Sequence, residues 1–186
     1  ASASPRRADL LRAAAIPFEV QVADVDESPV PGEKPETYVQ RLAAEKARVA
    51  AARTPGRRVL AADTTVVAGG VILGKPADAA DAIRMLRNLS GRVHLVLTGV
   101  CLAGPEPGRQ VVALEQTSVE FATMSEGEIE AYVGSGEPMD KAGAYGIQGI
   151  GARFVLSIKG DFYTVMGFPV AKLYQMLKNC EGFGIR

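Results

Sequence analysis

The sequence predicts an α/β fold in one domain. Runs with the apolar spacing of helices alternate along the chain with the short apolar or alternating runs typical of strands. The length of 186 residues lies within the usual size of one domain, and a hydrophobic share of 47% is ordinary for a globular protein. Because no repeat, low-complexity segment or linker interrupts the chain, we expect a single domain spanning residues 1–186.

The first half of the chain predicts two helices and several strands. The first helix runs from Arg6 to Ala15, because Ser4 offers a capping hydroxyl before it and Pro5 suits the first helical position. The other elements of this half are a strand at 17–22, a helix at 35–53, a buried strand at 58–62 and two short strands between 66 and 73. The last two flank Gly69-Gly70, a dipeptide typical of hairpin turns.

The second half continues the alternation and ends in a helix. Ser125 and Glu128 have the spacing of a capping box, which predicts a helix start. The predicted elements are a helix at 79–89, strands at 93–102 and 110–121, a helix at 125–133, a strand at 153–158 and a helix at 170–179.

A glycine-rich run at 135–155 separates the last two of these helices. Asp140, Lys141, Tyr145 and Gln148 stand among its glycines. Glycine lets the backbone turn tightly and approach a ligand closely. A flexible surface loop is the simpler interpretation, but the run is poor in Ser and Pro and leads into an apolar strand. We therefore expect a rigid, partly buried loop that carries polar groups for function.

The composition excludes several classes of function. With 21 basic and 21 acidic residues the net charge is zero, which gives no electrostatic footprint for nucleic acid or an anionic membrane. No run approaches the ~20 apolar residues of a membrane span, and the N-terminus lacks the apolar core of a signal peptide. Cys101 and Cys180 have no metal-ligand spacing and are expected to be free thiols in the cytoplasm. His94, the sole histidine, lies in a strand pattern, which nearly excludes histidine-based nucleophilic catalysis.

Three places carry charged residues suited to chemistry. Arg6 and Arg7 fall at a helix N-terminus, where they either receive an anion or are simply solvated. The carboxylates at 24–27 form either a solvated turn or a divalent-cation site. Asp63 comes directly after a predicted buried strand, at the end where α/β sheets bind ligands. Lys75 is followed by Pro76, which restricts its backbone.

The ordered set of short motifs resembles the Maf family of nucleotide pyrophosphatases. The motifs are Ala-Ser-Ala-Ser-Pro-Arg-Arg at 1–7, Val-Asp-Glu at 25–27, Glu-Lys-Ala at 45–47, Ala-Asp-Thr at 62–64, Gly-Lys-Pro at 74–76, Leu-Ser-Gly at 89–91 and the glycine-rich run at 136–149. Each motif is weak alone, but their order along essentially the whole chain is specific. The apolar strand that precedes the first motif in the family is nearly absent here, which removes no motif residue.

The resemblance implies both a fold and an activity. The fold would be a single α/β domain with a central twisted mixed sheet, helices on its faces and a cleft between two lobes, related to the inosine triphosphatases. The activity would be metal-dependent hydrolysis of a nucleoside triphosphate to the monophosphate and pyrophosphate, which removes non-standard or excess nucleotides. Arg6, Thr64 and Gln148 are similar to the branch of the family that hydrolyses dTTP and UTP.

The same resemblance implies roles for individual residues. Asp63 would accept the proton of the attacking water, with Glu27 and Lys75 completing the catalytic group. Glu27 and Asp63 would also hold Mg²⁺ or Mn²⁺, although an aspartate here can orient water, bind metal or do both. The phosphates would be bound by four residues from three separate segments, Ser4, Arg7, Lys46 and Lys141. Lys141 and Asp140 can equally form a buried pair that shapes the loop.

Two other classes of function compete with this interpretation. One is a non-catalytic nucleotide-binding module, which would keep the basic residues but lack Glu27 and Asp63. The other is a regulator of cell division acting through partners, for which we find no large apolar face or charged tail. Within the enzymes, 7-methyl-GTP or a purine triphosphate is the alternative substrate. The expected partner is a small-molecule nucleotide, with a homodimer as a further possibility.

Overall fold

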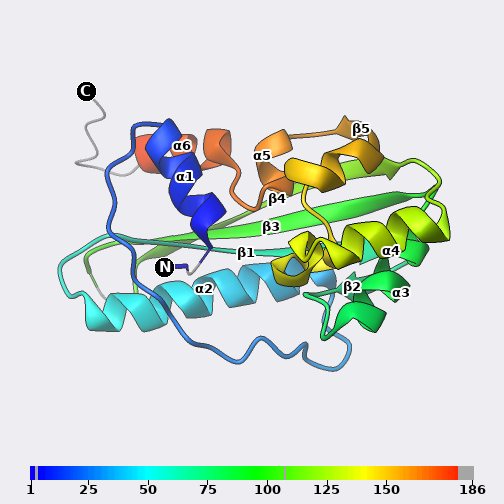
Figure 1. The fold of residues 1–186 in the computed structure, drawn as a ribbon. Coiled ribbons are helices and arrows are strands. Elements are labelled where there is room, and N and C mark those ends of the chain that lie inside the picture. Colours follow the sequence, from blue (N-terminus) through cyan, green and yellow to red (C-terminus); the bar gives the residue numbers. More distant parts are fainter. Residues whose placement is uncertain (3, 107, 180–186) are drawn as a thin grey trace. The chain divides into compact units, whose positions relative to one another are not determined.

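The computed structural model describes residues 1–2, 4–106 and 108–179, so Cys180 lies outside the described residues. Its strands form one five-stranded sheet in the order β2-β1-β3-β4-β5 (Figure 1). The strands are β1 (Val59–Ala68), β2 (Val71–Leu73), β3 (Val93–Ala103), β4 (Gln110–Phe121) and β5 (Val155–Lys159). The α-helices are α1 (Pro5–Ala13), α2 (Pro35–Arg53), α3 (Ala79–Leu89), α4 (Glu126–Gly134), α5 (Phe162–Val165) and α6 (Val170–Lys178). This is the predicted α/β class.

Two strand pairs have a defined register, and both are antiparallel. β1 and β2 pair as a hairpin around Gly69 and Gly70, whose φ angles of 56° and 81° confirm the predicted turn. β4 and β5 pair with an irregularity between Glu120 and Phe121. A mixed sheet needs at least one parallel pair of strands, and the two pairs with a defined register do not supply it.

Local sequence signals set the helix boundaries. The helix α2 has the predicted bounds, and proline occupies its first turn. The α3 helix also has the predicted bounds, and Asp78 caps it by accepting a hydrogen bond from the Asp81 N–H. The Ser125 and Glu128 capping box is present at the start of α4. These caps satisfy backbone N–H groups that have no partner within the helix.

The structure corrects three local predictions. Within the described part of the chain, residues 17–22 form no strand. The backbone hydrogen bond described between these residues and another segment runs from the Ser2 N–H to the Gln21 carbonyl, and one such bond does not make a strand pair. Ser4 is the N-cap of α1 but its side chain makes no capping bond among the described contacts. Asp63 does not end a strand, because β1 continues through it to Ala68.

The glycine-rich run forms three short 3₁₀ helices rather than an irregular loop. They are η1 (Glu137–Asp140), η2 (Ala142–Ala144) and η3 (Gly149–Phe154). Gly143 has a φ of 71°, and a Cβ placed there would come within 2.7 Å of the Val66 side chain. The predicted partial burial of the run is therefore confirmed, since Gly143, Ala144 and Tyr145 are buried, while its rigidity stays a prediction.

The chain divides into two compact units, each assembled from separate segments. Unit 1 comprises residues 1–63, 98–115 and 167–186, and unit 2 comprises residues 64–97 and 116–166. In unit 1, alanines on one face of α2 pack against apolar residues of β1 and β3. Gly99 permits this approach, because a Cβ there would lie 2.4 Å from the Val39 carbonyl oxygen.

Unit 2 has a larger apolar core. Its buried residues come from β1, α3, β4, α4 and the glycine-rich run, and include Leu86, Phe121, Tyr132 and Phe154. The glycine-rich run is anchored to this core by its own buried side chains, Ala144, Tyr145 and Phe154.

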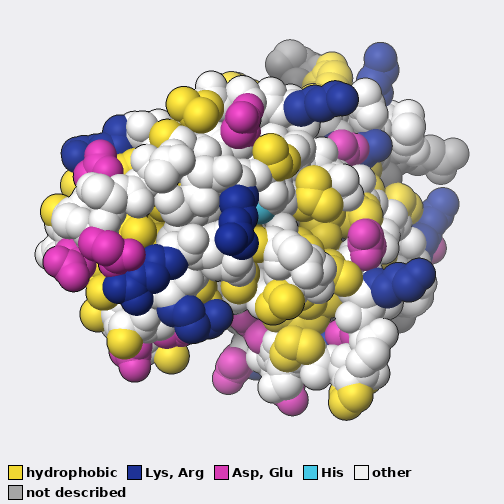
Figure 2. All heavy atoms as spheres, turned by 90° about the vertical axis from the view of Figure 1, so that its right-hand side faces the viewer, with side chains coloured by type: hydrophobic (Ala, Val, Ile, Leu, Met, Phe, Trp, Pro, Cys, Tyr) yellow, Lys and Arg dark blue, Asp and Glu magenta, His cyan; other side chains and the backbone are white. Residues whose placement is uncertain are grey.

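The surface agrees with the neutral net charge. On the face drawn in Figure 2, basic and acidic side chains are interspersed with hydrophobic ones. Across the described residues, every helix is too short or too polar to cross a membrane.

Candidate functional site

Lys46 in unit 1 holds two carboxylates together. Its Nζ lies 2.6 Å from Glu27 Oε1 and 2.6 Å from Asp63 Oδ1. Lys46 and Asp63 are 8% and 7% exposed, whereas the Glu27 side chain is half exposed. Burying a charge is costly unless it is paired, and in this ion triad each buried group faces a partner of opposite charge.

The positions of the three residues follow from the elements that carry them. Lys46 lies on the buried face of α2 together with Leu42, Ala43 and Ala50, so its side chain is directed at the sheet. Asp63 lies within β1, a strand that is buried along most of its length. A buried lysine facing a buried strand needs an anion opposite it, and Asp63 is that anion.

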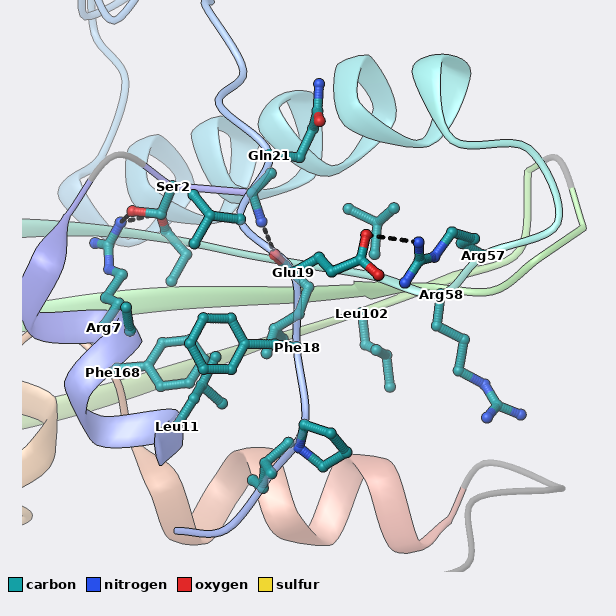
Figure 3. A pocket seen from close by; sticks show the side chains of 18 of the residues that line it. Ser2, Arg7, Leu11, Phe18, Glu19, Gln21, Arg57, Arg58, Leu102 and Phe168 are labelled. Carbon is teal, nitrogen blue, oxygen red and sulfur yellow. Dashed lines mark hydrogen bonds and ion pairs between the residues drawn. The ribbon is translucent and has the colours of Figure 1, made fainter. Parts of the chain in front are cut away.

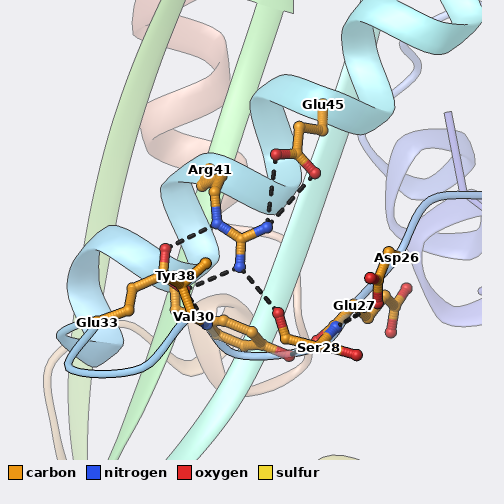
Figure 4. Close-up of polar contacts among 8 residues, drawn as sticks. All are labelled: Asp26, Glu27, Ser28, Val30, Glu33, Tyr38, Arg41 and Glu45. Carbon is orange, nitrogen blue, oxygen red and sulfur yellow. Dashed lines mark hydrogen bonds and ion pairs between the residues drawn. The ribbon is translucent and has the colours of Figure 1, made fainter.

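Glu27 reaches the triad from an irregular segment, residues 24–33, which we call the acidic strap. Arg41 of α2 holds the strap through two bonds to Glu33, at 2.7 Å from Nε and 2.8 Å from Nη2 (Figure 4). The Arg41 Nη2 group also donates to the Ser28 carbonyl at 3.2 Å, and the Tyr38 hydroxyl donates to the Glu27 carbonyl at 2.8 Å. The backbone that follows the Glu27 side chain, from the Glu27 carbonyl onward, is thereby fixed to α2.

The charges in this region shift two pKa values. The hydrogen bonds that Arg41 donates to the Glu33 carboxylate raise the pKa of Arg41, so it remains a cation under all ordinary conditions. Burial, followed by the nearby carboxylates of Asp63 and Glu27, raises the pKa of Tyr38 to about 12. Tyr38 therefore stays a neutral hydrogen-bond donor to the strap.

Arg7 is anchored beside Asp63 by backbone oxygens. Its Nε donates to the Gly167 carbonyl at 2.8 Å, and its Nη1 donates to the Ala62 carbonyl at 2.8 Å and to Ser2 Oγ at 3.0 Å. Burial lowers the pKa of Arg7, while the charges of Asp63 and Glu27 act in the opposite direction. Arg7 thus places a fixed cation next to β1 where Asp63 follows Ala62.

A cavity of about 230 Å³ adjoins Arg7 within unit 1 (Figure 3). Apolar side chains, including Leu11, Phe18 and Phe168, supply much of its lining, and Glu19 and Arg57 form an ion pair of 2.7 Å at its edge. Neither Glu27, Lys46 nor Asp63 lines it. It nevertheless borders the carboxylate centre through Arg7 and Ala62, which lie beside Asp63.

Unit 2 contains four of the predicted site residues, Thr64, Lys75, Lys141 and Gln148. Thr64 follows Asp63 in β1 and is half-buried, whereas Lys75 and Gln148 are exposed. The Gly143 N–H donates to the Gly74 carbonyl at 3.0 Å, which joins the turn before Lys75 to the glycine-rich run. This contact brings two of the predicted motifs together.

Lys141 forms the predicted pair with Asp140, at 2.6 Å between Nζ and Oδ1. Lys141 is largely buried, but 60% of the Asp140 side chain is exposed. Only the lysine of the predicted buried pair is therefore buried. Lys141 Nζ also donates to the Glu137 carbonyl. The pair therefore shapes η1, as one of the two interpretations predicted.

The structure assembles one part of the predicted site and leaves another as a prediction. Glu27, Lys46 and Asp63 meet, with Arg7 beside them. Arg6 belongs to unit 1, whereas Thr64 and Gln148 belong to unit 2, so their common substrate pocket stays a prediction. Ser4 contributes its backbone N–H to Ser2 Oγ at 3.1 Å, and its role with phosphate is likewise untested.

The carboxylate centre fits a hard divalent cation. Glu27 and Asp63 already converge on one positive group, the Lys46 ammonium. Among the residues that the structure describes, no group of three or more His, Cys, Asp or Glu side chains forms a metal cage. Mg²⁺ needs only one or two carboxylates when phosphate oxygens and water complete its shell, unlike structural Zn²⁺.

The family model described as Maf-like protein matches residues 1–180. The chain belongs to the Maf-like family. Maf-like relatives of similar sequence carry the name dTTP/UTP pyrophosphatase. The one from Koribacter versatilis is 53% identical over 178 residues, covering 96% of this chain and 91% of that protein. Those from Symbiobacterium thermophilum and Myxococcus xanthus are 54% and 52% identical, covering 95% and 96% of this chain and 90% and 89% of those proteins.

Arg41 and Tyr38, which hold the acidic strap, were not singled out by the sequence analysis. Arg41 and Glu45 have the i,i+4 spacing of a helix pair, which was the available signal. The stronger contact of Arg41, to Glu33, crosses from helix to irregular chain and follows no periodicity.

Proposed function

We propose that this protein hydrolyses dTTP and UTP to the nucleoside monophosphate and pyrophosphate. The observation that carries the proposal is the convergence of Glu27 and Asp63 on the Lys46 ammonium, at 2.6 Å each. Relatives named dTTP/UTP pyrophosphatase support the substrate class, since they are 53% and 54% identical to this chain over nearly its whole length.

In the proposed reaction, the oxygen of a water forms a bond to the α-phosphorus. The bond from that phosphorus to the oxygen bridging to the β-phosphate breaks, and pyrophosphate leaves with the electron pair. Asp63 accepts the proton that the water loses and later releases it to solvent. Since Asp63 is buried and ion-paired at one oxygen, its carboxylate is held in a fixed position for this transfer.

Glu27 and Asp63 would hold a divalent cation, Mg²⁺ or Mn²⁺. Such an ion supplies neutralisation of the charge that grows on the phosphate oxygens. The acidic strap orients Glu27 for this role through Arg41 and Tyr38.

Positive side chains would bind the triphosphate. Lys46 is held at the carboxylate centre, and Arg7 is fixed beside it by the Ala62 carbonyl. Exposed Lys75 and partly buried Lys141 would add charge from unit 2, with Ser4 as a hydrogen-bonding group. Arg6, Thr64 and Gln148 would select the pyrimidine, because amide and hydroxyl groups suit its O4 and N3 edge.

A panel of nucleoside triphosphates tests the proposal. With Mg²⁺ present, we expect kcat/KM for dTTP and UTP to exceed that for ATP, GTP and 7-methyl-GTP by about 10⁴-fold, since a pocket that hydrogen-bonds a base rejects ligands leaving its groups unpaired. Equal values for purines would overturn the pyrimidine assignment. Absence of pyrophosphate release from every nucleotide would overturn the enzyme assignment itself.

The Asp63→Asn variant tests the assigned proton acceptor. We expect kcat for dTTP to fall about 10²–10⁴-fold while nucleotide binding is largely retained. Asp24→Asn is the matched control, because Asp24 is an exposed carboxylate on the acidic strap. An Asp63→Asn enzyme with more than about a tenth of the wild-type kcat would contradict the role.

A further inference from the structure

The Glu137 carboxylate is the centre of a hydrogen-bond network in unit 2. Its Oε2 accepts from the Ile150 N–H at 2.8 Å, and its Oε1 accepts from the Gly151 N–H at 3.0 Å. The Tyr132 hydroxyl donates to the same Oε1 at 2.9 Å. One side chain of η1 thereby binds the backbone at the start of η3.

Tyr132 extends this network to a second point of the glycine-rich run. Its hydroxyl oxygen accepts from the Gly146 N–H at 3.1 Å. Tyr132 lies in α4, is 2% exposed, and packs edge-on against Phe154 with ring centroids 5.3 Å apart. We call Glu137 and Tyr132 the loop clasp.

The loop clasp binds the chain on both sides of Gln148. Gly146 lies two residues before Gln148, and Ile150 lies two residues after it. Gln148 itself is exposed, and within the described structure its side chain has no hydrogen-bond partner. Its position is therefore determined by the backbone on either side, which the clasp holds.

Gly149 and Gly151 are required because their backbone lies very close to the Glu137 and Tyr132 side chains. A Cβ at Gly149, where φ is 80°, would lie 2.6 Å from Glu137 Oε2. A Cβ at Gly151 would lie 2.5 Å from the Tyr132 hydroxyl oxygen and 2.5 Å from the Gly146 carbonyl oxygen. All three contacts are closer than a Cβ tolerates, so the backbone of Gly149 and Gly151 lies directly against the Glu137 and Tyr132 side chains.

Glu137 is suited to act as an ionised acceptor. Burial opposes its charge, but the Ile150 and Gly151 N–H groups, the Tyr132 hydroxyl and Lys141 together hold the pKa below its ordinary value. A carboxylate accepts several bonds at once, and bonds to a charged acceptor are stronger than neutral ones.

We propose that Glu137 and Tyr132 are positioning residues for substrate choice, because they fix Gln148 where it meets the base. This inference rests on the proposed function, in which Gln148 selects pyrimidines. Neither residue touches the substrate in this proposal. Their effect on the reaction passes through the backbone from Gly146 to Gly151.

The Tyr132→Phe variant removes one hydroxyl, and with it the bonds to Glu137 and Gly146, while keeping the ring that packs on Phe154. We expect the ratio of kcat/KM for dTTP to that for ATP to fall about tenfold or more, since small displacements of positioning groups are costly. Pyrophosphate release from the triphosphate, measured as kcat for dTTP, should change less than the ratio.

Tyr145→Phe is the matched control. Tyr145 is a buried tyrosine of the same run whose hydroxyl lies 2.9 Å from His94 Nε2, outside the loop clasp. This variant also loses a buried hydroxyl, but we expect its dTTP-to-ATP ratio to stay within about twofold of wild type. An equal fall in both variants would overturn the clasp, because general loosening of unit 2 would then explain the result.

A double-mutant cycle separates positioning from any other effect. If the clasp acts through Gln148, Tyr132→Phe should change the dTTP-to-ATP ratio in the wild type but not in a Gln148→Ala background. The same loss in both backgrounds would overturn the proposal. Equal wild-type kcat/KM for dTTP and ATP would instead overturn the proposed function, so the two failures are distinct.

Hydrogen exchange tests the clasp without any substrate. In Glu137→Gln one end of the carboxylate becomes an amide NH₂ donor, which cannot accept from both Ile150 and Gly151. We expect the backbone amides of Gly146, Ile150 and Gly151 to exchange at least about tenfold faster in Glu137→Gln and in Tyr132→Phe, while α3 amides keep their rates. Unchanged exchange at these three amides would overturn the clasp.

Discussion

Lys46 occupies the position between Glu27 and Asp63 that a bound cation would share. An ammonium and a divalent ion would compete for the same two carboxylate oxygens. In the free protein the Lys46 ammonium is therefore the counter-ion of Glu27 and Asp63. Removing Lys46 would leave Asp63 buried beside Glu27 without that counter-ion. Breaking a buried pair in this way costs about 3–5 kcal/mol of folding free energy.

We expect Lys46→Met to bind Mn²⁺ more tightly than wild type when no nucleotide is present, because two unneutralised carboxylates attract a dication. The variant should also be less stable, and Mn²⁺ should restore part of its Tm by binding the folded state. Titration calorimetry with MnCl₂ and thermal unfolding with and without Mn²⁺ measure both effects. Lys159→Met, at an exposed position, is the control. Mn²⁺ affinity equal to or weaker than wild type would contradict this view of Lys46.

At the scale of elements, α2 organises the site from one side. It contributes Lys46 to the carboxylate centre, and Tyr38 and Arg41 to the acidic strap. The strap has no helix or strand of its own between residues 24 and 33. Side chains of α2 therefore supply hydrogen bonds to its carbonyl groups, which in a sheet would come from a neighbouring strand.

Arg41→Lys should loosen the acidic strap, because lysine cannot make the two-pronged contact with Glu33 and also reach the Ser28 carbonyl. We expect kcat/KM for dTTP to fall about tenfold through Glu27, and the amides of the strap to exchange faster. Arg48→Lys is the control, since Arg48 is exposed on the same helix. Wild-type kinetics together with faster exchange would show that strap order does not limit the reaction.

Elements governed by local signals could be predicted from the sequence, and those governed by distant contacts could not. The bounds of α2 and α3 and the hairpin at Gly69-Gly70 follow from proline, capping and turn residues that act within a few positions. The strand predicted at 17–22 was wrong because alternation alone does not supply a partner; Val20 and Val22 are more than half exposed. The polar run Asp63-Thr64-Thr65 suggested a strand end, but threonine favours strands and β1 continues.

The candidate site divides in the same way. Glu27, Lys46 and Asp63 were predicted through the family resemblance, and the structure brings them together. The contacts of Arg41 with Glu33 and of Glu137 with Ile150 span chain positions that no periodicity links. The cytoplasmic location and the homodimer stay predictions from the sequence.

At the scale of the whole molecule, one buried histidine makes stability depend on pH. His94 is 2% exposed, its Nε2 lies 2.9 Å from the Tyr145 hydroxyl, and in the described structure its Nδ1 has no partner. Burial lowers the pKa of His94 to about 4 from 6.5. The unfolded chain therefore binds a proton between these values that the folded protein does not, and protonation favours unfolding.

We expect this contribution to be fully present above pH 6.5 and to be lost as the pH falls toward 4, by up to about 3 kcal/mol. The free energy of unfolding of wild type and of His94→Gln, measured by urea titration at intervals over this range, gives the contribution as a difference, which cancels the titration of the carboxylates. A difference that stays constant across the range would contradict the lowered pKa.

The division into units 1 and 2 has a consequence for how such a chain is built and inherited. The chain crosses between the units at 63/64, 97/98, 115/116 and 166/167, so neither unit is a continuous stretch. A fragment that ends before residue 166 therefore carries incomplete pieces of both units, because unit 2 needs residues 116–166 and unit 1 needs residues from 167 onward. A single crossover therefore cannot exchange one whole unit for a foreign one.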